Sequence, residues 1–118
     1  MIRDNVVIDK SMEFAIRIVK LYKYLQSEKS ETVMSKQILR SGTSIGANAR
    51  EGVYGQSRGD FLSKMSIALK ETVETEYWLE LLSKTGYLKT QEYESIKTDC
   101  GELAKMLTAT VKTTKSDK

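Results

Sequence analysis

The chain contains no proline, and its apolar residues recur at steps of three and four over four long segments. Proline lacks a backbone N–H and its ring clashes with the preceding turn, so uninterrupted helices exclude it, whereas turns, sheets and linkers usually contain some. Steps of three and four place side chains on one face of an α-helix. No segment alternates with a period of two over a useful length. The sequence therefore predicts an all-α protein.

Four helices are expected, over residues 9–27, 32–55, 58–85 and 90–112. Asp9 or Ser11 can cap the first helix, since short polar side chains accept bonds from the first unpaired amides. Ser57 and Asp60 offer a capping box for the third helix, and Thr90 can cap the fourth. The tail 113–118 has no apolar residue, so we expect it to be disordered.

Helices of about 20 residues are each roughly 30 Å long, and connections of a few residues force neighbours to pack antiparallel. The chain of 118 residues is long enough for one domain and too short for two ordinary ones. The expected architecture is therefore a single domain over residues 1–118, an antiparallel up-down-up-down four-helix bundle.

The second segment is unusual because Gly42, Gly46 and Gly52 interrupt its apolar pattern. Each glycine costs a helix about 1 kcal/mol relative to alanine. Gly42 and Gly46 lie on one side next to Ala49, where a neighbouring helix can approach closely. A kink near Gly42 is the competing interpretation, and a continuous helix is favoured.

The chain lacks the side chains on which most catalysis depends. It has no histidine, the commonest general base and a usual zinc ligand, and its one cysteine, Cys100, lies on an apolar stripe as an inert thiol. The glycine-rich stretch 41–46 lacks the Gly-Lys-Ser/Thr ending of a phosphate loop. Di-metal bundles use Glu-x-x-His motifs, which cannot occur here. We expect no enzyme, no metal, no cofactor and no small-molecule substrate.

A polar seam runs beside the apolar face of the second segment. Its acidic partners lie on the third segment, where four glutamates fall between residues 71 and 80 with no basic residue. We expect Arg40 to pair with Glu71 or Glu74, while Ser44 and Asn48 bond across helices and fix their register. The alternative is that Arg40 is simply exposed. The candidate network comprises Arg40, Ser44, Asn48, Glu51, Glu71 and Glu74.

Two stretches carry a resemblance to a known family. They read QILRSGTSIGANAREG at 37–52, then DF at 60–61, IALKE at 67–71 and ETEYWLELL at 74–82. This resembles the bacterial four-helix-bundle proteins encoded in intervening sequences of 23S rRNA genes, through the pattern Arg-x-x-x-Ser-Ile-x-x-Asn-x-x-Glu-Gly, with Ala49 where relatives often have a bulkier residue. The resemblance implies an antiparallel bundle without enzymatic activity. It also implies a relation to accessory variability proteins of diversity-generating retroelements, which form basic pentameric barrels that bind nucleic acid.

The resemblance and the charge distribution together suggest a function. The net charge is +3, and basic residues dominate residues 35–58 and the tail. The candidate nucleic-acid ligands, for RNA or DNA, are Lys36, Arg40, Arg50, Arg58, Lys112 and Lys115. Excess apolar surface on the third helix indicates a homo-oligomer, such as a pentamer. The alternative function is a structural or protein-interaction module that binds no nucleic acid.

The expected compartment is the cytoplasm. One cysteine cannot form an internal disulfide, and the N-terminus lacks the apolar run of a signal peptide. No eighteen apolar residues occur together, so no membrane span is expected.

Overall fold

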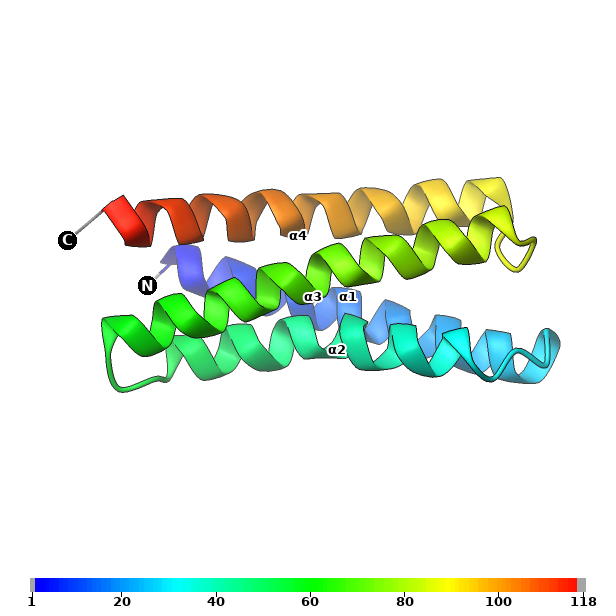
Figure 1. The fold of residues 1–118 in the computed structure, drawn as a ribbon, viewed down its shortest axis with the longest axis horizontal. Helices are drawn as coiled ribbons and strands as arrows, with labels where there is room; N and C mark the ends of the chain where they lie inside the picture. Colours follow the sequence, from blue (N-terminus) through cyan, green and yellow to red (C-terminus); the bar gives the residue numbers. More distant parts are fainter. Residues whose placement is uncertain (1, 117–118) are drawn as a thin grey trace.

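The computed structural model describes residues 2–116, with side chains described from residue 6 onward. Its four helices are α1 (Ile2–Glu28), α2 (Met34–Val53), α3 (Arg58–Lys84) and α4 (Thr90–Ser116). Each helix packs against its neighbours in the order α1–α2–α3–α4, and α4 closes the bundle against α1. The expected antiparallel four-helix bundle is confirmed (Figure 1), with overall extents of 48 × 21 × 20 Å.

Helix α1 begins at Ile2, two turns earlier than the sequence predicts, so neither Asp9 nor Ser11 caps it. The reason is packing: Val7 is only 1% exposed and continues the buried face toward the N-terminus. Ser11 is buried inside the helix, and its hydroxyl donates to the Ile8 carbonyl at 3.0 Å. Burial of an additional apolar turn outweighs the preference of Asp9 and Ser11 for a helix end.

Helix α4 also extends past the expected end, through Ser116, so residues 113–116 are helical and not disordered. The Thr114 hydroxyl donates to the Thr110 carbonyl at 2.7 Å, and Arg58 donates to the Thr114 carbonyl at 3.0 Å. A cation at the last carbonyls of a helix stabilises that end. The prediction of disorder for residues 117–118 falls outside the described residues.

The start of α2 depends on a capping residue that the sequence pattern does not reveal. The Glu31 carboxylate accepts the backbone N–H of Val33, Met34 and Ser35 at 2.7–3.1 Å. Glu31 is 8% exposed, and burial by itself raises its pKa, but these backbone bonds outweigh burial and lower the pKa below the ordinary value. A charged carboxylate thus replaces the usual short polar cap.

The other helix ends follow the expected chemistry more closely. The Ser57 hydroxyl accepts the Asp60 amide at 3.0 Å, as the capping box at the start of α3 predicts. Gly86 follows α3 with φ = 88°, a left-handed conformation that glycine adopts without strain. Thr90 is the first residue of α4, one position too late for the capping role expected of it.

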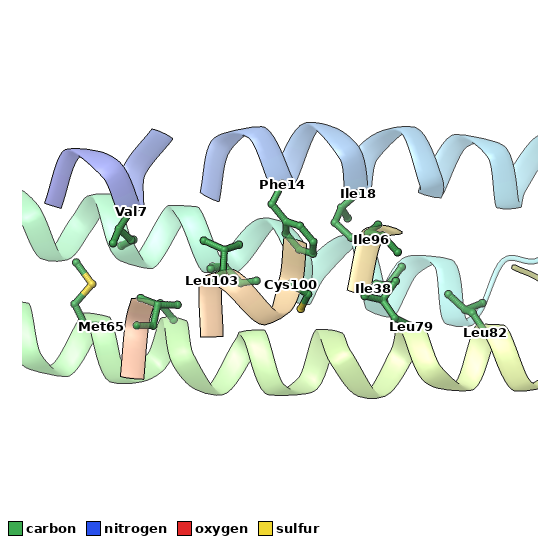
Figure 2. Close-up of a cluster of buried hydrophobic side chains, with 14 of the residues drawn as sticks. Val7, Phe14, Ile18, Ile38, Met65, Leu79, Leu82, Ile96, Cys100 and Leu103 are labelled. Carbon is green, nitrogen blue, oxygen red and sulfur yellow. The ribbon is translucent and has the colours of Figure 1, made fainter. Parts of the chain in front are cut away.

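The apolar side chains of all four helices meet in one continuous core (Figure 2). Phe14 and Ile18 from α1, Ile38 from α2 and Leu79 from α3 are at most 2% exposed. Cys100 of α4 lies among them, fully buried. The four described helices therefore share one hydrophobic core.

Helix α2 is continuous across its glycines, and the alternative of a kink at Gly42 is wrong. A Cβ atom at Gly42 would lie 2.7 Å and 2.9 Å from the two γ carbons of Ile18. A Cβ atom at Gly46 would lie 3.1 Å from the Ser11 hydroxyl. The glycines therefore allow α1 to approach α2 closely, which explains their presence in a helix.

Candidate nucleic-acid interface

Arg40 connects α2 to α3 through two carboxylates. Its guanidinium donates to Glu71 at 3.2 Å and to Glu74, and the Trp78 indole N–H donates to the same Glu74 oxygen at 3.0 Å. The Arg40 side chain is 50% exposed, so the cluster lies at the surface of the helix pair and not inside it. Two carboxylates surround one guanidinium, so this cluster carries a net charge of −1 and does not attract phosphate.

The remaining polar residues of the network do not join the two helices as expected. The prediction that Ser44 and Asn48 bond across helices is wrong: Ser44 donates to the Arg40 carbonyl at 2.6 Å and Asn48 to the Ser44 carbonyl at 2.9 Å. Both side chains bond to the preceding turn because it lies closer than α3. The buried bond between helices runs instead from Thr75 to Ser41, at 2.9 Å.

Glu51 lies apart from the Arg40 cluster and pairs with α3 at a different level. Its carboxylate is 3.0 Å from the Lys64 ammonium group, and both side chains are more than one-third exposed. Solvent-exposed pairs of this kind contribute little to stability. Of the six residues of the expected network, only Arg40, Glu71 and Glu74 are therefore joined to one another across the two helices.

Four of the six candidate phosphate ligands gather at one end of the bundle. Both ends of the described chain and the α2–α3 connection lie at that end (Figure 1). Arg50 is in the last turn of α2, Arg58 is the first residue of α3, and Lys112 and Lys115 are in the last two turns of α4. The bond from Arg58 to the Thr114 carbonyl fixes the start of α3 beside the end of α4. We call Arg50, Arg58, Lys112 and Lys115 the basic end.

The other two candidates do not belong to the basic end. Lys36 is in the first turn of α2, fourteen residues before Arg50, which corresponds to roughly 21 Å along the helix. Arg40 is occupied by its two carboxylates. The structure thus brings together four of the six residues that the sequence suggests and leaves two outside.

An aromatic residue beside the basic end is not predicted from the sequence pattern. Tyr54 caps the C-terminus of α2 and is 78% exposed, the highest value among the large hydrophobic side chains described. It stands between Arg50 and Arg58 in the chain, at the loop that joins α2 to α3. An aromatic residue between two arginines at a helix end is the signal that identifies it. Exposed aromatic rings beside cations are typical of surfaces on which nucleic-acid bases stack.

Cys100 lies in a buried environment that keeps its thiol unreactive. Burial raises the pKa of its thiol to about 12, and the negative charges of Glu76 and Asp99 act in the same direction. The thiol lies 3.6 Å from the Thr72 carbonyl inside the core. A thiolate is the reactive form of cysteine, and this environment disfavours it.

The surface also exposes apolar side chains, although not those that the sequence suggests. On α3 the expected excess set is Leu62, Leu69, Trp78 and Leu81, and the first three of these pack partly against the core. The most exposed apolar residues of α3 are instead Val73 and Tyr77, each 57% exposed. On α1 the most exposed apolar residues are Met12 and Ile16, at 46% and 50%. None of the helices described is long and apolar enough to span a membrane.

Comparison with known proteins agrees with the fold. A crystal structure of a protein of unknown function from the S23 ribosomal protein family of Bacteroides thetaiotaomicron superposes with a TM-score of 0.91. The two sequences are 62% identical over 93% of this chain and 98% of the other. No curated protein matches the chain. The family model described as 23S rRNA-intervening sequence protein matches residues 3–109, and the chain therefore belongs to that family.

Proposed function

We propose that this protein is a non-enzymatic, oligomeric nucleic-acid-binding bundle that acts in the cytoplasm and contacts RNA or DNA through its basic end. The observation that carries this proposal is the convergence of Arg50, Arg58, Lys112 and Lys115 on one end of the bundle. Each cation that neutralises a phosphate releases counterions, which drives association with a polyanion. The relation to accessory variability proteins is part of the same proposal.

Two carboxylates of the described residues near the basic end interact with groups outside it. Glu51 already faces Lys64, at 3.0 Å. Asp60 lies in the first turn of α3, where a negative charge interacts favourably with the helix dipole. Tyr54 adds an aromatic face on which an unpaired base can stack, so a single-stranded region of the ligand is expected to contact the loop.

Assembly into an oligomer would increase the positive electrostatic potential that the basic ends produce. A pentameric ring presents five basic ends, and the potential of a ring exceeds that of a subunit with a net charge of +3. The exposed apolar residues of α1 and α3 are candidates for the contacts between subunits. Light scattering coupled to gel filtration measures the mass; a species of one subunit at micromolar concentration would refute the oligomer.

The test of nucleic-acid binding is a gel-shift titration with structured RNA and with duplex DNA at several salt concentrations. Four phosphate contacts on duplex DNA predict a slope of roughly −3.6 for log Kobs against log salt concentration, and the double substitution Lys112→Gln with Lys115→Gln reduces it to roughly −1.8. The matched control neutralises Lys70 and Lys105, two exposed lysines away from this end. Absence of binding at low salt refutes the function, and equal loss in both double variants refutes the site.

The second candidate function is a protein-interaction module that binds no nucleic acid. It is favoured by the apolar side chains at the surface, Met12 and Ile16 on α1 and Val73 and Tyr77 on α3. The two candidates predict different responses to charge. Under the second, neutralising Lys112 and Lys115 leaves partner binding unchanged, whereas polar substitution of Val73 and Tyr77 weakens it.

A further inference from the structure

The end of the bundle opposite to the basic end contains a groove between α1 and α4. These two helices contact each other less than any other neighbouring pair. In Figure 1, α1 runs away from α4 toward its C-terminal end. The opening there has a volume of about 420 Å³. This value lies at the low end of the roughly 300–1,000 Å³ that is typical of small-molecule sites.

The floor of the groove is apolar and held in place by the core. It consists of Leu21 from α1, Leu88 from the α3–α4 connection and Ile96 from α4. Leu88 and Ile96 are 8% and 4% exposed and belong to the core, and Leu21 packs against it. A floor made of core residues exists before any ligand arrives, which reduces the entropy lost on binding.

The rim of the groove is cationic. Lys20 of α1 and Lys89 of the α3–α4 connection line it and are exposed, and among the described side chains neither has an ion-pair partner. Glu92 is the one carboxylate that lines the groove. The Arg17 guanidinium also lines it, but Asp99 and Ser95 hold that group at 2.7 Å each, so its charge is balanced. Two unpaired lysines against one glutamate leave the rim positive.

We propose that this groove binds a small amphipathic anion, an aliphatic or aromatic carboxylate whose apolar body covers Leu21 and Ile96 while its carboxylate lies between Lys20 and Lys89. The floor offers aliphatic contacts and no buried hydrogen-bonding group, so it matches a hydrocarbon body and not the polar edge of a base. The rim attracts a negative head group and repels a positive one. The lining residues include no histidine and no cysteine, and the proposal is one of binding without chemical transformation.

The proposal does not depend on nucleic-acid binding, because the groove and the basic end share no residue. A bound small molecule differs from the expectation drawn from the sequence, because a groove formed by the divergence of two helices is not visible in the sequence. Glu92 lowers the affinity of the rim for an anion, and its neutralisation provides a further test. The variant Glu92→Gln should bind the anion more tightly than the wild type.

The experiment titrates decanoate, below its micelle concentration, into the full ¹⁵N-labelled chain and follows the amide resonances by NMR. We expect saturable shifts at Leu21, Leu88 and Ile96 with a dissociation constant on the order of 1 mM or tighter. Decyltrimethylammonium has a comparable apolar body with a positive head, and acetate has the head without the body. Neither should produce these shifts, because the site needs both features.

Charge reversal tests the rim with a matched control. The double variant Lys20→Glu with Lys89→Glu should weaken decanoate binding at least about tenfold. The control Lys70→Glu with Lys105→Glu changes the net charge equally and should leave binding within about twofold. Circular dichroism shows that each variant is folded.

Several results would overturn the proposal. Shifts spread over the whole surface, equal binding of decyltrimethylammonium, or equal weakening in both double variants would each show that the groove does not select an amphipathic anion. Shifts at the floor residues that depend on protein concentration without ligand would show that a second copy occupies the groove. If the unmodified chain binds decanoate but not duplex DNA, the proposed function is refuted and the groove proposal is not.

Discussion

Substitution of Gly42 by alanine tests directly why a helix of this bundle tolerates glycine. The added Cβ atom would lie 2.7 Å and 2.9 Å from the γ carbons of Ile18 and 3.2 Å from its Cβ. Ile18 is fully buried, and a β-branched side chain has few alternative rotamers in a helix. The methyl group therefore forces α1 and α2 apart or strains Ile18.

Two opposing effects set the magnitude. Alanine gains about 1 kcal/mol of helix propensity over glycine. Overpacking of a well-packed core costs roughly 1–3 kcal/mol. With two contacts below 3.0 Å to a buried branched side chain, we expect a cost near the upper limit and a net destabilisation of about 1–2 kcal/mol. For 118 residues this lowers Tm by about 4–8 °C.

Gly101 provides a matched control within the same chain. It lies inside α4, and a Cβ atom there would meet nothing within 4 Å. Gly101→Ala should therefore gain helix propensity without a clash and raise Tm by about 4 °C. Thermal unfolding followed by circular dichroism at two protein concentrations measures both variants, since linkage to assembly makes Tm depend on concentration.

A double-mutant cycle identifies Ile18 as the cause. Ile18→Ala alone costs about 2–5 kcal/mol because it leaves a cavity. In that background the γ carbons are absent, so Gly42→Ala should become neutral or stabilising, as in Gly101→Ala. If Gly42→Ala instead stabilises the wild type as much as Gly101→Ala does, the argument that close helix approach explains the glycine is wrong.

Three further substitutions probe the polar groups. Glu31→Gln should lower the free energy of unfolding by about 1–2 kcal/mol at pH 7. Because the folded-state pKa of Glu31 lies below 4.5, this difference should disappear as the pH falls through that pKa. Denaturant titrations across pH measure it, with Glu102→Gln as the control, and equal behaviour of the two variants would contradict the capping role. Arg40→Met should lower Tm by about 2–4 °C, since a half-exposed pair contributes only about 0.5–1 kcal/mol, and an unchanged melt would show that the pairing with the α3 carboxylates contributes nothing. With a pKa of about 12, Cys100 should react with a thiol reagent at pH 8 only after unfolding, and rapid labelling of the native protein would contradict its burial.

Much of the fold is predictable from the sequence because its signals are local. The steps of three and four identify four helices, and Ser57 with Asp60 marks the start of α3 correctly. The ends of α1 and α4 are not predictable in this way. Val7 extends α1 through burial in the core, and Thr114 remains helical with Arg58 bonded to its carbonyl, so both depend on partners distant in the chain.

The candidate site shows the same division. The pairing of Arg40 with acidic residues of α3 is suggested by complementary charges, and the structure contains both contacts. The hydrogen bonds of Ser44 and Asn48 are not predictable from the sequence, because a short side chain reaches its own preceding turn before it reaches a neighbouring helix. Only the arrangement of helix ends shows that Arg50 and Lys112 lie at one end and Lys36 at the other.

The sequence alone determines that this chain forms four helices and which face of each helix is buried, since propensity and periodicity act between residues three or four apart. The lack of proline and the four amphipathic segments need no tertiary information. The tertiary structure decides which cations share a surface, why Gly42 faces Ile18, and that α1 diverges from α4 to open a groove. Those features depend on the distance and angle between helices, which side-chain packing across the whole bundle sets.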